Sequence, residues 1–170
     1  MPASTPSAPG DASLIVVDGV QDPGNLGSLL RTAAAAGIRH ALLGEGCAQA
    51  WSPRALRAGM GAQFVVRIEE GCELLARLES YPGLCLATAL REDAHPLYEL
   101  DLRGPVAWLF GAEGQGLSPA LLARADGCVI IPMAAGIESL NVAAAAAVCL
   151  FEQARQLRAT GTIRGVNFPS

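Results

Sequence analysis

The sequence predicts an α/β protein built on one mostly parallel sheet with helices on both faces. Apolar runs recur along the chain and are continuous rather than alternating with polar residues, which is typical of strands buried on both faces. Between them lie segments with helix-capping residues, so strands and helices alternate as they do in parallel sheets. The 170 residues are 51% hydrophobic and 5% aromatic, which is enough for one domain with an aliphatic core.

Two apolar runs and a glycine define the first elements. Residues 14–18 form an apolar run that closes on an acid, and we expect a buried strand there. Residues 24–37 are expected to be a loop followed by a helix, with Asn25 as its cap and Gly37 as its end. Residues 41–43 predict a second strand.

Cap and turn signals define the middle of the chain. Ser52 precedes a proline at the first helical position, which predicts a short helix through residue 58. Residues 64–68 predict a strand. Residues 70–79 predict a helix that ends before a Tyr-Pro-Gly turn, and residues 84–90 predict a buried strand.

Similar signals define the last third. Residues 105–110 predict a buried strand, and a glycine-rich loop follows. Ser118 precedes a proline and predicts a helix to about residue 125. Residues 129–131 predict the last strand and residues 139–158 the longest helix, whose alanines permit close packing on one side. The residues of this helix expected to face solvent are Glu152, Arg155 and Arg158.

Charge and cysteine content argue against several classes of protein. The formal net charge is −4 and every basic residue is arginine. This argues against broad nucleic-acid affinity, although arginine is the better phosphate ligand. The five cysteines form no CxxC pair and are expected to be buried thiols in a reducing compartment. His40 and His95 lie far apart with no ligand spacing around them, so we expect no metal site.

The hydropathy and the chain ends predict a cytoplasmic protein. No apolar run approaches the ~20 residues that a membrane span needs. Residues 1–12 are rich in Pro, Ser and Ala and lack the order of a signal peptide, so a disordered leader is expected. One domain over residues 13–160 and a tail over residues 161–170 complete the predicted organisation.

Three loops carry polar residues suited to a ligand site. Asn25 and Arg31 follow a turn, Glu113 lies among three glycines, and Ser139 and Asn141 stand at the start of the longest helix. Taken singly, each loop is also compatible with an ordinary turn or helix cap. In open α/β sheets, ligands bind where strand ends meet helix N-termini, so a site is expected at this edge of the sheet.

Together the three loops closely resemble the motifs of a known enzyme family. The stretches read, in order, P-G-N-L-G-S-L-L-R-T-A-A-A-A-G, L-F-G-A-E-G-Q-G-L-S and I-P-M-A-A-G-I-E-S-L-N-V. They are similar to those of the SpoU/TrmH family of RNA ribose 2′-O-methyltransferases, in the SPOUT superfamily, over about residues 14–158. The resemblance implies a homodimer and a C-terminal deep trefoil knot, which is a rare exception among protein folds.

The resemblance also implies S-adenosylmethionine as the cofactor. Adenine would be held by backbone groups of Ile131 to Met133, and the glycine loop would approach the ribose and methionine parts. The implied cofactor-binding residues are Thr88, Ala89, Leu90, Gly111, Ala112, Glu113, Gly116, Ile131, Pro132, Met133, Ser139, Leu140 and Asn141.

The implied reaction is methyl transfer to a ribose 2′-hydroxyl of RNA, with rRNA favoured over tRNA. The implied catalytic residues are Asn25, Arg31, Glu113, Ser139 and Asn141. Two roles stay open for Arg31: general base, or clamp on an RNA phosphate and the developing alkoxide. The clamp is easier to defend, because a guanidinium holds its protons tightly. Glu113 and Asn141 would organise the site.

Two departures from the family bear on the RNA partner. Many members carry an RNA-binding domain before the catalytic one, and here only the short leader precedes residue 14, so we expect the chain to be the catalytic part of a longer protein. The second departure is the acidic balance, which gives little general RNA affinity. Binding would therefore rest on the missing domain and on a local patch of Arg31, Arg54, Arg57 and Arg91.

Two other classes of function compete with the methyltransferase. One is a catalytically silent knotted module that binds RNA or a nucleotide. The other is a dinucleotide-dependent oxidoreductase, but the glycines follow a late strand rather than the first one, which argues against it.

Overall fold

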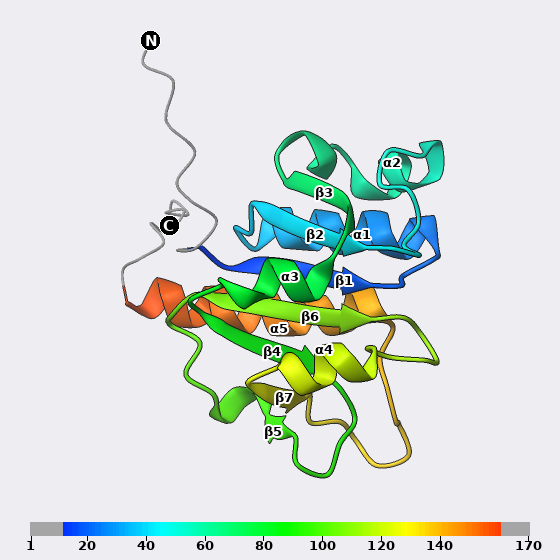
Figure 1. Ribbon diagram of the computed structural model, residues 1–170. Coiled ribbons are helices and arrows are strands. Elements are labelled where there is room, and N and C mark those ends of the chain that lie inside the picture. Colours follow the sequence, from blue (N-terminus) through cyan, green and yellow to red (C-terminus); the bar gives the residue numbers. More distant parts are fainter. Residues whose placement is uncertain (1–11, 161–170) are drawn as a thin grey trace.

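In the computed structural model, residues 12–160 are described, and they form a parallel sheet with helices on both sides (Figure 1). In chain order the elements are β1 (Leu14–Asp18), α1 (Pro23–Ala35), β2 (His40–Gly44), α2 (Pro53–Gly59), the 3₁₀ helix η1 (Ala62–Phe64), β3 (Arg67–Cys72), α3 (Leu74–Glu79), β4 (Leu84–Thr88), β5 (His95–Pro96), the 3₁₀ helix η2 (Leu97–Glu99), β6 (Val106–Gly111), α4 (Pro119–Arg124), β7 (Gly127–Ile130) and α5 (Val142–Ala159). The strand order is β3-β2-β1-β6-β4-β7-β5, and the strand pairs are parallel. The predicted α/β class is confirmed.

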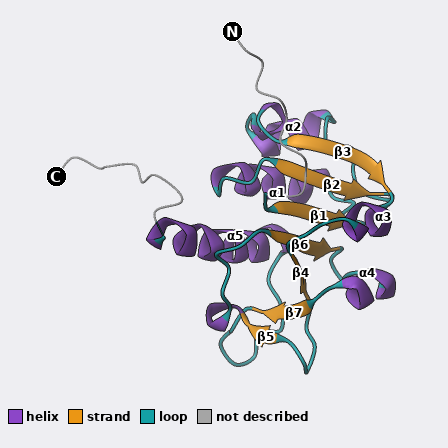
Figure 2. Cartoon of the chain, turned by 60° about the vertical axis from the view of Figure 1, so that its left-hand side comes forward, coloured by secondary structure: helices purple, strands orange, loops and turns teal. Residues whose placement is uncertain are grey.

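The central strands β1 and β6 separate two hydrophobic cores. Ile15 and Trp108 point to the core under α1 and α5, whereas Val16 and Leu109 point to the core that includes residues of α3 and α4. Figure 2 shows these two pairs of helices on opposite faces of the sheet. Successive residues of a strand face opposite sides, and both sides are covered here. The strands therefore read as unbroken apolar runs.

Asp22 caps α1. Its carboxylate accepts a hydrogen bond from the backbone N–H of Asn25 at 2.8 Å, and Pro23 occupies the first turn. The prediction that Asn25 caps this helix is therefore wrong. Asn25 lies inside the first turn, where its side chain is free to contact another element.

A glycine allows α2 to pack closely on α1. A Cβ at Gly27 would lie 2.4 Å from the carbonyl oxygen of Ala55 and 2.7 Å from the Cβ of Ala58. Any side chain at this position would push the helices apart. The buried amide of Gln63 donates hydrogen bonds to the carbonyls of Ala50 and Ala55, at 3.1 and 2.9 Å. It ties together the two segments on either side of Trp51.

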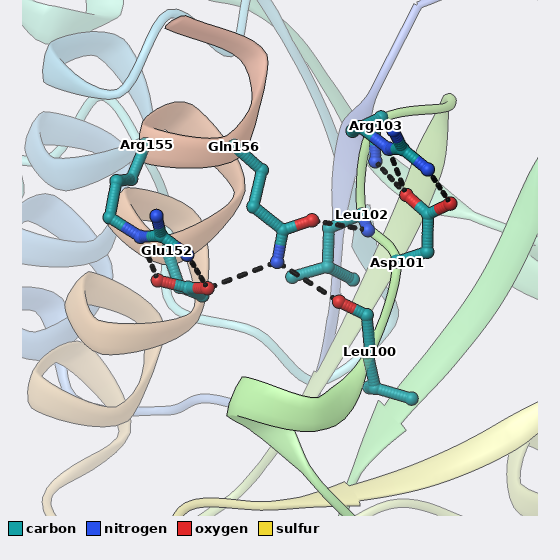
Figure 3. A network of polar contacts seen from close by, with 7 residues as sticks. All are labelled: Leu100, Asp101, Leu102, Arg103, Glu152, Arg155 and Gln156. Carbon is teal, nitrogen blue, oxygen red and sulfur yellow. Dashed lines mark hydrogen bonds and ion pairs between the residues drawn. The ribbon is translucent and has the colours of Figure 1, made fainter. Parts of the chain in front are cut away.

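Hydrogen bonds fasten α5 to the segment that leads into β6. The Gln156 amide accepts from the N–H of Leu102 at 2.8 Å and donates to the carbonyl of Leu100 at 3.0 Å (Figure 3). Glu152 accepts from Arg155 and Gln156 and is only 9% exposed. The prediction that Glu152 faces solvent is wrong, because this network turns its carboxylate toward neighbouring side chains.

The largest differences from the predicted elements lie around β3. Of the strand predicted over residues 64–68, only the last two residues are in a strand: Phe64 ends η1, and β3 begins at Arg67. Pairing with β2 extends β3 to Cys72, so the helix predicted over residues 70–79 is shortened to α3. The pairing partner, which the local sequence does not specify, decides the conformation of this segment.

The other predicted elements are confirmed with shifted ends. β4 ends at Thr88 rather than at residue 90, β7 spans Gly127–Ile130, and α5 begins at Val142 rather than at residue 139. The short strand β5 is present although no strand was predicted there. Its partner is β7, which is more than 30 residues later in the chain.

The predicted tail, and the predicted leader except for Ala12, lie outside the described residues. Within residues 12–160, no helix has the length and apolar character needed to cross a bilayer. The same residues contain no group of three or more His, Cys, Asp and Glu placed to hold a metal ion. All five cysteines are free thiols. Cys85, Cys128 and Cys149 are buried as expected, whereas Cys47 and Cys72 are only partly buried.

Candidate functional site

A cavity of about 740 Å³ opens at the carboxyl ends of β4, β6 and β7. Its walls come from residues 88–91, the glycine loop at 111–117, residues 129–131 and 133, and residues 139–142 with the first turn of α5. This is the edge of a parallel sheet where ligands bind. The volume lies within the range of small-molecule sites, roughly 300–1,000 Å³.

The glycine loop folds back on itself and carries Glu113. The N–H of Gly116 donates to the carbonyl of Ala112 at 2.8 Å. Gly114 and Gly116 have φ angles of 84° and 68°, which favour glycine. A Cβ at Gly111 would lie 2.3 Å from the carbonyl carbon of Gly116. These glycines are therefore required by the turn itself, and the turn places Glu113 in the cavity wall.

Three side chains that the sequence analysis selected meet beside the cavity. The Asn25 amide donates to Oε1 of Glu113 at 3.2 Å. The Asn141 amide donates to Oδ1 of Asn25 at 3.0 Å and to Oε1 of Glu113 at 2.9 Å. Each residue comes from a different one of the three predicted loops. We call Asn25, Glu113 and Asn141 the polar triad.

The cap of α5 determines which way the Asn141 amide points. Its Oδ1 accepts hydrogen bonds from the backbone N–H groups of Ala143 and Ala144, at 2.9 and 3.4 Å. The Nδ2 group must therefore face Asn25 and Glu113. A flipped amide would leave the helix N-terminus without its acceptor, and such N–H groups need one. One side chain thus starts the longest helix and completes the triad.

Most residues predicted to bind the cofactor line the cavity. They are Thr88, Ala89, Leu90, Gly111, Ala112, Glu113, Gly116, Ile131, Met133, Ser139, Leu140 and Asn141. Pro132 is not among the lining residues. The Thr88 hydroxyl donates to the carbonyl of Leu109 on the neighbouring strand, at 3.1 Å.

Several lining residues were not predicted to bind the cofactor. They are Arg91, Leu117, Leu122, Val129, Ile130, Val142 and Ala145. Gly114 and Gln115 also line the cavity, within the glycine loop that was expected to approach the cofactor. Helical spacing could have identified Ala145, because it lies four residues after Asn141 and therefore on the same face of α5. Leu117 and Leu122 carry no comparable signal, since apolar side chains near a turn are usually core residues.

The cavity wall is largely uncharged. Its two charged lining residues are Glu113 and Arg91. The Arg91 guanidinium donates to both carboxylate oxygens of Asp93, at 2.9 and 3.3 Å, and this contact lowers the pKa of the Asp93 carboxyl. The charge of Arg91 is therefore largely balanced. Glu113 leaves one wall negative, which favours a ligand with a cationic or neutral polar group there.

Arg31 does not line this cavity. It is exposed on α1, six residues after Asn25, which places it about 9 Å further along the axis and about 120° around it. The described residues give its guanidinium no hydrogen bond or ion pair. The structure therefore brings together Asn25, Glu113 and Asn141, with Ser139 also in the cavity wall, and leaves Arg31 apart from them.

The sequence matches known proteins over most of its length. The profile of the SpoU rRNA Methylase family matches residues 12–151. The chain is 40% identical over 150 residues to an uncharacterized tRNA/rRNA methyltransferase of Synechocystis sp., covering 87% of this chain and 55% of the relative. It is 37% identical over 146 residues to the 23S rRNA (guanosine-2′-O-)-methyltransferase RlmB of Photorhabdus laumondii, covering 84% and 59%.

The fold also matches solved structures over most of the chain. The crystal structure of an AdoMet-bound rRNA methyltransferase from Sinorhizobium meliloti superposes with a TM-score of 0.80 and 34% sequence identity. The match covers 88% of this chain and 58% of that chain. This chain thus spans less than two thirds of each of these three proteins.

Proposed function

The chain belongs to the SpoU rRNA methylase family, and we propose that it transfers a methyl group from S-adenosylmethionine to a ribose 2′-hydroxyl of RNA. The observation that carries the proposal is the polar triad beside the cavity, to which each of the three family-like loops contributes one residue. Ribosomal RNA is favoured as the substrate, because the RlmB relatives are named as 23S rRNA (guanosine-2′-O-)-methyltransferases.

The cavity suits S-adenosylmethionine. Ile131 and Met133 provide an apolar wall, and the backbone of Met133 forms no hydrogen bond with the described residues, so it is free to hold the adenine edge. Glu113 provides an anion to attract a sulfonium. When bound, the cofactor supplies an electrophilic methyl group, so the protein's task is to position the hydroxyl.

The polar triad is organised to hold that hydroxyl. Both amide donors of the triad contact Oε1 of Glu113, and Oε2 forms no hydrogen bond with the described residues. This second oxygen is free to accept a hydrogen bond from a ribose hydroxyl. Because Asn141 is held by the α5 cap, the carboxylate is oriented before any ligand arrives, and preorganisation of this kind favours catalysis.

We propose that a homodimer completes the site. α1 packs beside α5, Phe151 of α5 is 46% exposed, and Arg31 is exposed on α1. A second copy packed on these helices would cover Phe151 and bring Arg31 near an RNA bound between the copies. There Arg31 acts as a clamp on phosphate and on the developing alkoxide rather than as a base, because a guanidinium does not give up its proton at neutral pH.

We also propose that the C-terminal third is threaded as a trefoil knot. α4 and α5 lie on opposite faces of the sheet and are joined by β7 and residues 131–141. β7 lies between β4 and β5 rather than at the sheet edge. Gln156 then holds α5 against the segment before β6. An experimental structure that traces residues 131–141 without passing through the loop between β4 and β6 would refute the knot.

Calorimetry and methyl transfer test the proposed function together. Titration with S-adenosylmethionine should give saturable binding, and tritiated methyl groups should then pass to rRNA at ribose 2′-oxygens. Binding of the cofactor without transfer to rRNA or tRNA would favour the catalytically silent module. Absence of cofactor binding would refute the assignment of the cavity.

A further inference from the structure

An exposed cluster of apolar side chains lies beside α2. The rings of Trp51 and Phe64 have centroids 5.8 Å apart and are inclined at 70°, with 47% and 78% of these residues exposed. Met60 and Val65 are 70% and 55% exposed. We call these four residues the aromatic corner. Large apolar side chains gathered at the surface mark an interaction site more often than single ones do.

Basic residues accompany the aromatic corner. Residues 46–68 contain Arg54, Arg57 and Arg67 and no Asp or Glu, in a chain with a net charge of −4. Arg54 pairs with Asp22 and Arg67 with Glu69. Arg57 is exposed and forms no hydrogen bond or ion pair with the described residues. Single-stranded nucleic acid offers base faces for the rings and phosphates for the arginines. An apolar protein partner would account for the rings but not for the exposed and unpaired guanidinium of Arg57.

Met60 ends α2 with a backbone conformation that favours glycine. Met60 has a φ of 48° and ends α2 in the left-handed region, where helices usually place glycine. Among the described residues, Met60 is the only residue other than glycine with a positive φ. A methionine there costs stability relative to glycine and leaves most of its side chain in water. Contact with a partner would explain its presence.

The aromatic corner is held rigidly relative to the polar triad. Gly27 lets α2 pack closely on α1, and the two helices lie side by side in Figure 1. Nη2 of Arg54 lies 3.3 Å from Oδ1 of Asp22, which caps the helix that carries Asn25. A ligand on the corner would thus have a defined position relative to the triad.

We propose that the aromatic corner binds an unpaired base of the RNA substrate, while Arg54 and Arg57 contact the flanking phosphates. One ring stacks on the base and the other meets its edge, because the two rings are steeply inclined. This inference rests on the proposed function for the identity of the partner. It adds that the substrate presents a single-stranded nucleotide close to the methylated one.

Tryptophan fluorescence tests this directly. The chain has two tryptophans, and Trp108 is fully buried, so Trp51 reports contact at the aromatic corner. Titrating the whole chain with a single-stranded RNA of about 12 nucleotides, within the usual site size, should quench the emission saturably. A blunt RNA duplex of the same length should quench it much less.

Variants separate stacking from charge. Trp51→Ala with Phe64→Ala should weaken binding, measured by anisotropy of labelled RNA, roughly ten-fold or more and leave its salt dependence unchanged. Arg54→Ala with Arg57→Ala should reduce the slope of log K against log salt by about 1.4, the value for two phosphate contacts on a single strand. Tyr98→Ala is the matched control, because Tyr98 is 57% exposed on η2, which follows the strand at the far edge of the sheet.

Met60→Gly is a variant in which a loss of RNA affinity cannot be attributed to unfolding. Glycine suits the left-handed backbone at this position, so the melting temperature should be kept or raised while RNA affinity falls. A purely structural role of Met60 predicts unchanged affinity.

Three results would overturn the inference. They are unchanged affinity in both the double aromatic variant and Met60→Gly, equal quenching by the duplex, and shielding of Trp51 by self-association without RNA. The proposed function fails separately: if the parent chain binds RNA through the corner but transfers no methyl group, only the methyltransferase assignment is lost. If the parent methylates RNA and the aromatic variants keep its KM, only the corner is refuted.

Discussion

The side-chain oxygen of Asn141 caps α5, and its nitrogen donates to the other two members of the polar triad. Two substitutions can separate these contacts. Asn141→Ala removes both. Asn141→Ser keeps an oxygen at the helix N-cap, where serine is about as favourable as asparagine. Serine has no amide N–H to donate to Asn25 and Glu113, so it removes only the triad contacts. The pair therefore distinguishes a structural role from a functional one.

The structure sets the expected magnitudes. Asn141→Ala leaves the N–H groups of Ala143 and Ala144 without their side-chain acceptor, which costs about 1 kcal/mol of folding stability. In a chain of 170 residues this lowers the melting temperature by about 2–4 °C. The triad side chains are exposed, so their hydrogen bonds add little stability. Asn141→Ser should stay within about 1 °C of the parent, yet both variants should lose methyl transfer by about 100-fold through mispositioning.

Scanning calorimetry and initial rates of methyl incorporation into rRNA check these values. Cofactor affinity is measured beside them, so that a loss of rate can be assigned to the triad. Parental activity in Asn141→Ser would refute the role of the amide donor. Equal destabilisation by alanine and serine would refute the role of the oxygen as a cap.

Three further predictions follow from other parts of the structure. Arg31→Ala should abolish methyl transfer while calorimetry shows unchanged affinity for S-adenosylmethionine, since Arg31 does not line the cavity; undiminished turnover would remove Arg31 from the mechanism. Gly27→Ala should destabilise the fold by about 2 kcal/mol in urea titrations, because its Cβ would lie 2.4 Å from the Ala55 carbonyl oxygen. Gly104→Ala is the control, since a Cβ there meets nothing within 4 Å, and equal effects of the two would contradict the packing argument. The Arg77 guanidinium, with His40, lowers the pKa of Glu69 to about 2. Because this folded value lies below the unfolded value near 4.5, the contacts stabilise the fold above that pH and lose their effect as pH falls toward 2. The gap in unfolding free energy between the parent and Glu69→Gln, on the order of 1 kcal/mol at neutral pH, should shrink through this window. A constant gap would argue against these contacts as the cause.

Local signals predicted the elements whose conformation depends on neighbouring residues. Ser52 and Ser118 cap α2 and α4 as expected, each followed by proline. The buried runs at β1 and β6 are strands because an apolar stretch of that length gains most from burial on both faces. The motifs also singled out Asn25, Glu113 and Asn141, whose side chains the structure brings together.

Local signals gave the wrong prediction at three places. Phe64 was expected in a strand, but it ends η1 and stands exposed against Trp51. Asn25 was expected to cap its helix, but Asp22 takes that position. Glu152 was expected in solvent, but it is buried and accepts hydrogen bonds from Arg155 and Gln156. At Phe64 tertiary packing selected one of two conformations that the local pattern allowed. The partners of Asn25 and Glu152 lie only three or four residues away, so there the local pattern itself offered two candidate contacts.

The sequence by itself determined the α/β class, most of the elements and the residue types of the polar triad, because caps and apolar runs act between residues close in the chain. Only the tertiary structure decided that Asn25 bonds to side chains 88 and 116 residues away. It also decided that Arg31 lies apart from the cavity and that an aromatic corner stands beside α2. These relations depend on strand order and helix packing, which set distances between residues that no local interaction connects.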